Sequence, residues 1–188
     1  RTTAIAVALE VGERLPETFD CTRRADHALQ GGGEGAVVAT TRPATMFGDT
    51  AVAVNPKDGR WTHLVGKKVV IPFIGRAVPV IADDYVDFEF GTGCLKVTPA
   101  HDQNHWQIGQ RHKLDIINIF TESGALNENA PPAYRGLDRF KARTKIVEDL
   151  TAAGLMGEIK EHPQQIGHCY RCHTIVEPYL TAQWFVKM

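Results

Sequence analysis

The pattern that decides the fold lies in residues 91–113, which read GTGCLKVTPAHDQNHWQIGQRHK. Residues 94–98 form a β-prone run that follows two glycines, and Pro99 ends this run. Asp102 is well suited to cap a helix that then continues through Lys113. A short strand followed closely by a capped helix predicts a mixed α and β structure.

Short β-prone runs continue on both sides of this stretch, separated by turn residues such as Asn55-Pro56 and Gly75. A short apolar run at residues 4–9 predicts a further strand near the N-terminus. The strands predicted in the middle of the chain are residues 36–40, 51–54, 68–72, 77–81, 94–98 and 116–120. Strands therefore dominate the middle of a β-rich α+β domain.

A second helix is predicted over residues 138–153. Asp138 can cap its start, Gly154 can end it, and Phe140, Val147 and Leu150 are spaced to share one face. These elements suggest three parts. Residues 1–35 hold a strand and a Gly-rich loop, residues 36–160 form the core, and residues 161–188 form a short arm rich in histidine and aromatic residues.

Composition narrows the classes of protein to consider. The chain has 188 residues, of which 43% are hydrophobic and 23% charged, as is ordinary for a globular domain. Lys and Arg number 21 against 22 Asp and Glu, which excludes a strongly basic protein that coats nucleic acid. No apolar run approaches the roughly 18 residues of a membrane span, and no convincing signal peptide begins the chain. We therefore expect a cytoplasmic location and no membrane partner.

A threonine-rich peptide at residues 40–45, Thr-Thr-Arg-Pro-Ala-Thr, is the first candidate binding element. Thr40, Thr41 and Thr45 offer hydroxyl groups beside the Arg42 cation at the end of a predicted strand. Such a set suits a ligand with hydroxyl groups and phosphate or carboxylate oxygens. Taken alone, the same residues are also typical of an ordinary strand-to-turn transition.

The second candidate element is the stretch from Phe90 to Asp102. Its glycines would allow the backbone to approach a ligand closely, and Lys96 and Thr98 alternate onto one face of an extended strand. Asp102 is either a functional carboxylate or simply the helix cap. No Ser or Cys lies in a nucleophile motif such as G-x-S-x-G, so covalent catalysis has little support.

Two cysteines, Cys169 and Cys172, form a C-x-x-C in the arm. With few cysteines in a chain of this length, the spacing indicates half of a four-ligand zinc site rather than a disulfide framework. A redox role is less favoured, because no βαβ pattern surrounds the motif. Cys94, in an apolar run, is expected to be a buried thiol.

Together these motifs resemble the editing domains of class I aminoacyl-tRNA synthetases. The resemblance rests on ATTRPATMFGDTAVAV at 39–54, GTGCLKVTPAHD at 91–102 and YRGLDRF at 134–140. It covers residues 36–188 and is strongest to the valyl-tRNA synthetase family. The resemblance implies a β-barrel-like core with surrounding helices, inserted into a longer synthetase.

The resemblance also implies an activity. The domain would hydrolyse threonine wrongly esterified to the 3′ end of the tRNA for valine, as part of an ATP-dependent valine–tRNA ligase. Threonine and valine are nearly isosteric, and an apolar pocket of such an enzyme is known to reject threonine only about 10²-fold. Its partners would be the tRNA(Val) 3′ end and the catalytic body, and the hydrolysis would need no cofactor.

The resemblance assigns roles to particular residues. Asp102, Lys96 and Thr98 would be catalytic, with Asp102 reading the threonine hydroxyl. The residues expected to bind substrate are Thr40, Thr41, Arg42, Thr45, Phe90 and His105. Cys169 and Cys172 would supply half of a structural zinc site whose other ligands lie outside this chain.

Two positions depart from the family pattern. His105 stands where relatives carry a second carboxylate suited to the substrate ammonium group, and Ala44 replaces an acidic or bulkier residue. A neutral His105 can accept a hydrogen bond from ammonium, whereas a charged one would repel it. His105 could also be a plain helix-surface residue. The His105 departure leaves open an editing-type fold that binds the tRNA end or a partner domain without hydrolysis. The C-x-x-C leaves open a third function, a zinc-stabilised docking arm.

Overall fold

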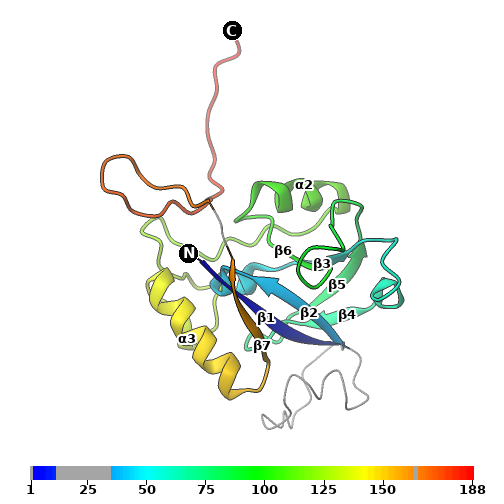
Figure 1. Ribbon diagram of the computed structural model, residues 1–188. Helices are drawn as coiled ribbons and strands as arrows, with labels where there is room; N and C mark the ends of the chain where they lie inside the picture. The colour runs from blue at the N-terminus through cyan, green and yellow to red at the C-terminus, as the bar shows by residue number, and fades with distance from the viewer. Residues whose placement is uncertain (1, 12–34, 163–164) are drawn as a thin grey trace.

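The computed structural model describes residues 2–162, except 12–34, and residues 165–188, and these residues fold around a mixed sheet. Within them the sheet has seven strands, in the order β2-β1-β4-β5-β3-β6, with β7 also pairing with β1 (Figure 1). The strands are β1 Thr2–Val11, β2 Gly35–Thr40, β3 Ala51–Val54, β4 Lys68–Val70, β5 Ala77–Ala82, β6 Cys94–Val97 and β7 Met156–His162. Five of the six strands predicted for the middle of the chain are therefore present, with ends shifted by at most two residues.

The strand pairing leaves the sheet open. β3 and β5 run parallel, and every other described pair is antiparallel. The end strands β2 and β6 lie close to each other, but no ladder joins them among the described residues. The α+β prediction is confirmed, whereas the expected barrel-like core is not, because a barrel requires hydrogen bonds all the way round.

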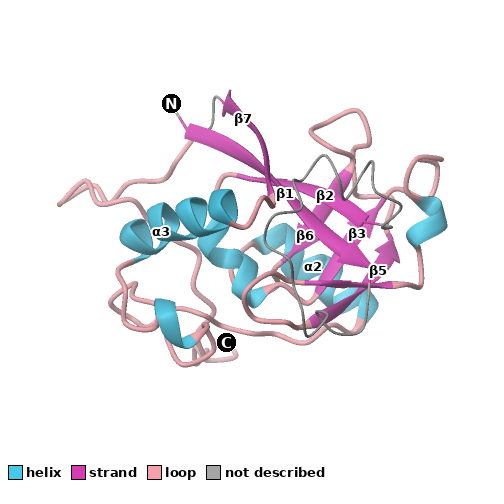
Figure 2. Cartoon of the chain, turned by 90° about the horizontal axis from the view of Figure 1, so that it is seen from below, coloured by secondary structure: helices cyan, strands magenta, loops and turns pink. Residues whose placement is uncertain are grey.

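Among the described residues, two α-helices flank the sheet, α2 over Gln103–His112 and α3 over Arg139–Ala152 (Figures 1 and 2). Both predicted caps are present: Asp102 accepts hydrogen bonds from two backbone N–H groups of α2, and Asp138 accepts one in α3. Short 3₁₀ helices η1, η2 and η3 cover Pro43–Gly48, Thr62–Leu64 and Pro132–Tyr134. α2 packs against β6, and α3 packs against η1 and β7.

The predicted buried face of α3 is partly wrong. The helix buries Ala142, Ile146 and Leu150, whereas Phe140 is 39% exposed. The Arg139 guanidinium carbon lies 4.6 Å from the centre of the Phe140 ring, a cation–π contact that accounts for an aromatic ring at the surface. Leu150 is thus the fully buried member of the predicted set.

The strand predicted at 116–120 is not formed, apart from a single bridge between Phe120 and Leu126. Its backbone groups bond to side chains and to a turn instead of to a neighbouring strand. The Ile119 N–H donates to His101 Nε2 at 3.0 Å, and Asn127 Nδ2 donates to the Asn118 carbonyl at 2.9 Å. Conversely, β7 was not predicted, because its sequence MGEIKEH lacks a clear apolar alternation.

The core lies on both faces of the sheet. One apolar cluster joins the sheet to η1 and α3 and includes Leu9, Phe47 and Ile146. A smaller cluster between β3, β6 and α2 includes Val97 and Ile108. β3 is buried on both faces, as expected for a strand in the middle of a covered sheet. η1 and α2, which hold Thr45 and His105 and begin directly after Arg42 and Asp102, are thereby fixed against the sheet.

The N-terminal strand and the arm complete the described structure. β1 pairs with β2, β4 and β7, so it belongs to the same sheet as the core. The predicted Gly-rich loop falls, apart from Gly35, outside the described residues. A hairpin closed by the bridge between His168 and Ile175 follows β7, and the exposed residues 179–188 extend away from the body (Figure 1).

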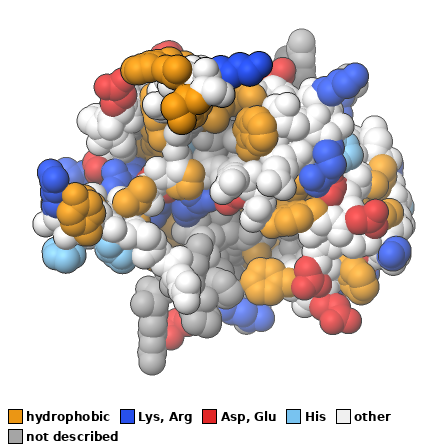
Figure 3. Space-filling view, turned by 90° about the horizontal axis from the view of Figure 1, so that it is seen from above, with side chains coloured by type: hydrophobic (Ala, Val, Ile, Leu, Met, Phe, Trp, Pro, Cys, Tyr) orange, Lys and Arg blue, Asp and Glu red, His pale blue; other side chains and the backbone are white. Residues whose placement is uncertain are grey.

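The described surface carries mixed charge. In the face shown in Figure 3, Lys and Arg side chains are interspersed with Asp and Glu, in keeping with the formal net charge of -1. No helix among the described residues is long and apolar enough to cross a membrane.

Candidate functional site

The threonine-rich peptide forms a turn between β2 and η1. The Arg42 N–H donates to Thr40 Oγ1 at 3.1 Å, and Thr45 Oγ1 donates to the Arg42 carbonyl at 2.9 Å. Pro43 occupies the first position of η1, where its fixed φ favours the start of a helix. The ordinary strand-to-turn interpretation is therefore correct for the backbone, and it leaves the Arg42 side chain directed at α2.

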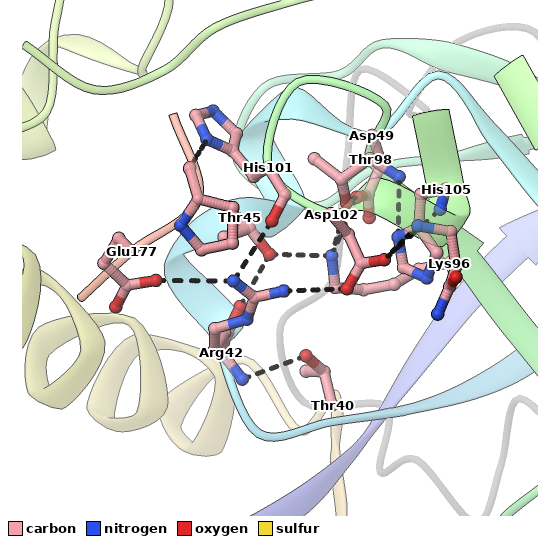
Figure 4. A network of polar contacts seen from close by, with 12 residues as sticks. Thr40, Arg42, Thr45, Asp49, Lys96, Thr98, His101, Asp102, His105 and Glu177 are labelled. Carbon is pink, nitrogen blue, oxygen red and sulfur yellow. Dashed lines mark hydrogen bonds and ion pairs between the residues drawn. The ribbon is translucent and has the colours of Figure 1, made fainter. Parts of the chain in front are cut away.

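The Arg42 guanidinium is held by three acceptors from two other segments (Figure 4). Its Nη2 donates to Asp102 Oδ2 at 3.2 Å, and its Nη1 donates to the His101 carbonyl at 3.1 Å. The same Nη1 lies 3.4 Å from Oε2 of Glu177, which belongs to the arm. Arg42 thus joins the threonine-rich peptide to the second motif and to the arm.

Asp102 uses its two carboxylate oxygens differently. Oδ1 accepts from the backbone N–H groups of Asn104 at 2.9 Å and His105 at 3.3 Å, which caps α2. Oδ2 accepts from Arg42. A carboxylate has about four acceptor positions, so Oδ2 can accept a further hydrogen bond. The cap and a functional role are compatible in this geometry.

Lys96 lies beneath the site rather than in a cavity. Its Nζ donates to Thr45 Oγ1 at 2.8 Å, Asp49 Oδ1 at 2.9 Å and Thr98 Oγ1 at 2.7 Å, so its three protons are all used (Figure 4). Thr98 Oγ1 in turn donates to Asp49. Burial lowers the pKa of Lys96 and raises the pKa of Asp49, and the charge of each partner opposes these shifts. The cluster ties η1 to β6.

His105 is inward-facing and neutral. Its Nδ1 accepts the Thr98 N–H at 3.2 Å, and burial lowers the pKa of His105 to about 4. Because Nδ1 is occupied, the proton of the neutral ring lies on Nε2. His105 is therefore more than a helix-surface residue. Its Nε2 carries the proton and is not the acceptor expected for an ammonium group.

Phe90 is separate from this polar network. Its side chain is 64% exposed at the edge of a hollow of about 500 Å³, a size typical of small-molecule sites. Thr40 and Thr41 also line this hollow, with residues of β1, β7 and the 90–92 turn. The predicted substrate-binding residues Phe90, Thr40 and Thr41 therefore meet around one cavity.

A rigid anchor positions the turn that carries Phe90. Arg60 Nη2 donates to the Phe88 carbonyl at 2.6 Å, and Trp61 Nε1 donates to the Thr92 carbonyl at 2.9 Å. Gly93 has φ +78°, and a Cβ there would lie 2.6 Å from Arg60 Nη2. At Gly93 the close approach is therefore to the protein's own side chains, whereas Gly91 lines the hollow beside Phe90, where close approach of a ligand stays a prediction.

A second hollow of about 240 Å³ lies between the core and the arm. Thr41, Arg42 and Asp102 line it from the core, and Glu177 lines it from the arm. Thr41 also lines the larger hollow, so the two share the threonine-rich peptide. The polar network and the Phe90 hollow are neighbouring parts of one surface.

Cys169 and Cys172 lie in the arm hairpin. The Cys169 N–H donates to the Thr174 carbonyl at 2.8 Å, and hydrogen bonding with Thr174 lowers the pKa of Cys172 to about 7. The described residues contain no group of three or more His, Cys, Asp or Glu side chains that could hold a metal ion. A structural zinc needs four ligands, so the zinc half site stays a prediction that requires two further ligands. Cys94 is buried as predicted, and burial raises its pKa to about 12.

Sequence comparisons identify relatives of the chain. A family model described as "Leucyl-tRNA synthetase, editing domain" matches residues 57–135. The chain is 56%, 55% and 52% identical to the valine–tRNA ligases of Geobacter sulfurreducens, Helicobacter pylori and Bacillus subtilis, over 156, 151 and 157 residues. These alignments cover 83%, 80% and 83% of this chain. The chain is an editing domain of the valyl-tRNA synthetase family.

This editing domain matches a small part of each relative. The three alignments cover 18%, 17% and 18% of those ligases, so the chain spans less than a fifth of the curated relatives it matches. The sequence did not predict a role for two residues of the site, Asp49 and Glu177. Asp49 lies within the first motif of the resemblance, at residues 39–54, and Glu177 lies far from the other site residues along the chain.

Proposed function

We propose that this editing domain hydrolyses threonine wrongly esterified to the 3′ end of the tRNA for valine. The single observation that supports it most directly is the position of the Asp102 carboxylate. It lies beside Arg42 and lines the hollow between the core and the arm. Thr41 lines both this hollow and the Phe90 hollow, so the two adjoin. Threonine differs from valine mainly by one hydroxyl group, so a second pocket must read that group.

Asp102 is the proposed reader of the hydroxyl. Oδ2 accepts from Arg42 and has room for one more donor, which the threonine O–H can supply. Valine has a methyl group there and would leave the carboxylate oxygen without that partner. Leaving a polar group unpaired costs about 1–3 kcal/mol, which corresponds to a discrimination of roughly fivefold to 160-fold.

The Phe90 hollow is the proposed site of the terminal adenosine. The exposed Phe90 ring offers a stacking surface for a base, as aromatic side chains do in many sites for single-stranded RNA. Thr40 and Thr41 offer hydroxyl groups for the ribose at the other side of the same hollow. The ester would then lie near Arg42, between the two hollows.

The reaction itself is ester hydrolysis. A water molecule attacks the ester carbonyl carbon, the bond to the ribose oxygen breaks, and the ribose hydroxyl leaves with a proton. Arg42 can stabilise the negative charge that develops on the carbonyl oxygen. His105, with its proton on Nε2, can donate to a substrate oxygen. Lys96 and Thr98, predicted to be catalytic, would act by holding Thr45 and η1 in place.

The remaining proposals concern the whole protein. We propose that the domain acts within a cytoplasmic valine–tRNA ligase, with tRNA(Val) and the catalytic body as partners. The proposed hydrolysis uses water and protein donors and takes no cofactor. A structural zinc would take Cys169 and Cys172 together with ligands outside the described residues.

The deciding experiment measures hydrolysis of threonyl-tRNA(Val) and valyl-tRNA(Val) by the full-length protein. The native protein should hydrolyse the threonyl ester and spare the valyl ester, and Asp102→Ala should lose most of the first activity. Asp84→Ala, at an exposed position, is the matched control and should behave like the native protein. A native protein that binds threonyl-tRNA but leaves it intact would instead favour a binding module without hydrolysis.

A further inference from the structure

The arm contributes a mostly buried carboxylate to the site. The Glu177 side chain is 11% exposed, and its Oε2 lies 3.4 Å from Arg42 Nη1. Oε1 forms an ion pair with Arg143 Nη2 and lies 3.8 Å from Arg139 Nε. Glu177 is therefore the anion around which three arginines gather, one from the threonine-rich peptide and two from α3.

The position of Glu177 is fixed independently of its own charge. On one side, the Ile175 carbonyl accepts from Arg139 Nη2 at 2.8 Å. On the other, the Pro178 carbonyl lies 3.3 Å from Nδ1 of the fully buried His101. His101 Nε2 accepts the Ile119 N–H, so Nδ1 carries the proton that Pro178 accepts. The backbone on both sides of Glu177 is thus attached to the core.

Arg42 lies between two carboxylates that come from distant segments. Asp102 binds Nη2, and Glu177 binds Nη1 (Figure 4). Two acceptors at different nitrogens of the planar guanidinium set its orientation, whereas one acceptor would leave it free to turn about the contact. We propose that Glu177 is a positioning residue for Arg42 and holds the guanidinium where it acts on the ester.

This inference rests on the proposed deacylase function and adds a requirement to it. The arm must be seated on the core for the site to be complete, because the arm supplies one of the two carboxylates that orient Arg42. Removal of Glu177 leaves Arg42 near Arg139 and Arg143 with no anion between them, and like charges would push Arg42 away from its observed position. Misplacement of a catalytic group by about 1 Å can lower a rate about 10²-fold.

A double-mutant cycle in the full-length protein tests the inference. Single-turnover hydrolysis of threonyl-tRNA(Val) is measured for the native protein, Arg42→Ala, Glu177→Ala and the double variant. Glu177→Ala should lower the rate about tenfold, and in the Arg42→Ala background it should change the rate less than about twofold. A purely structural role would instead give the same loss in both backgrounds, and that outcome would overturn the inference.

Two further variants guard against misfolding and against a general loss of charge. Glu177→Gln keeps the shape of the side chain and one acceptor oxygen, so its rate of hydrolysis should lie between the rates of the native protein and Glu177→Ala. Glu148→Gln removes an exposed carboxylate from α3 and should leave the rate unchanged. Valine attachment to tRNA by each variant, measured in parallel, reports whether the protein is intact.

The outcomes separate the two proposals. If the native protein does not hydrolyse threonyl-tRNA(Val), the deacylase proposal fails and the positioning role fails with it. If the native protein and Glu177→Ala hydrolyse it equally fast, the positioning role alone is wrong. Non-additive losses in the Arg42 and Glu177 variants support both.

Discussion

Lys96 Nζ lies 2.9 Å from Asp49 Oδ1, and both side chains are more than nine-tenths buried. Lys96 follows the turn that carries Phe90, whereas Asp49 directly follows the 3₁₀ helix that begins after Arg42. The pair therefore joins the two sequence motifs from within the domain. Its hydrogen bonds with Thr45 and Thr98 leave none of the Lys96 protons unpaired.

Breaking this pair should destabilise the domain strongly. Lys96→Met leaves the buried Asp49 carboxylate without its cationic partner, so the free energy of unfolding should fall by about 3–5 kcal/mol. Urea unfolding followed by circular dichroism measures it. The exposed Lys141→Met is the control and should change stability by less than about 0.5 kcal/mol. A Lys96→Met variant as stable as this control would show that the pair contributes nothing.

The two roles of Asp102 can be separated by two substitutions. Asp102→Ala removes both the cap of α2 and the partner of Arg42, and the lost cap should cost about 1 kcal/mol. Asp102→Asn keeps an oxygen for the cap, so stability should be retained while deacylation is still lost. Asp138→Ala removes the equivalent cap of α3 and should lower stability without lowering deacylation. Full activity in Asp102→Asn would contradict a role for the charge.

Alanine substitutions at Gly93 and Gly59 test whether the contacts with Arg60 and Trp61 hold the Phe90 turn in place, with Gly59 as the control. A Cβ on Gly93 would lie 2.6 Å from Arg60 Nη2 and 2.7 Å from Asp58 Oδ2, whereas a Cβ on Gly59 meets nothing within 4 Å. Gly93→Ala should therefore lower stability by about 1–3 kcal/mol and slow deacylation, because the Phe90 turn must move. Gly59→Ala should be neutral or slightly stabilising. Equal effects of the two changes on unfolding would rule out the steric argument.

Acid should destabilise the domain through His101. Burial lowers the pKa of His101 to about 4, from an ordinary value of 6.5. Between these values the unfolded chain binds a proton that the folded domain does not, so protonation favours unfolding. The free energy of unfolding should fall from pH 7 to pH 4, by about 3 kcal/mol from this residue.

The pH effect is tested by comparing the pH dependence of the free energy of unfolding between a His101 variant and the native domain. His101→Gln has no titratable ring, so its free energy of unfolding should depend less steeply on pH between 6.5 and 4 than that of the native domain. The exposed His63→Gln controls for the loss of a histidine as such. Parallel pH curves for His101→Gln and the native domain would contradict the prediction.

The sequence predicted much of the local structure. The Asp102 and Asp138 caps and five of the six central strands depend on residues that are neighbours along the chain, so periodicity and turn residues are enough to find them. The strand at 116–120 failed for a long-range reason. Its apolar pattern is β-prone, but the buried His101 takes the Ile119 N–H that a neighbouring strand would have needed.

The roles of the site residues were harder to predict from the sequence than the secondary structure. Thr40, Thr41 and Phe90 do line one hollow, as their predicted roles require. For Lys96, the strand alternation indicated a shared face with Thr98 but not whether that face was open or buried. His105 is neutral because burial lowers its pKa, and its proton lies on Nε2 because Nδ1 accepts the Thr98 N–H; the spacing of the residues along the chain reveals neither.

By itself, the sequence determined the α+β class, the caps, the position of the two motifs and the resemblance to synthetase editing domains, because each depends on residues close together in the chain. The tertiary structure alone decided that Asp49 pairs with Lys96 and that Glu177 reaches Arg42 across 135 residues. Such contacts depend on the order and register of the strands and on where the arm packs against the core. These are set by the packing of whole elements, which no local pattern of residues specifies.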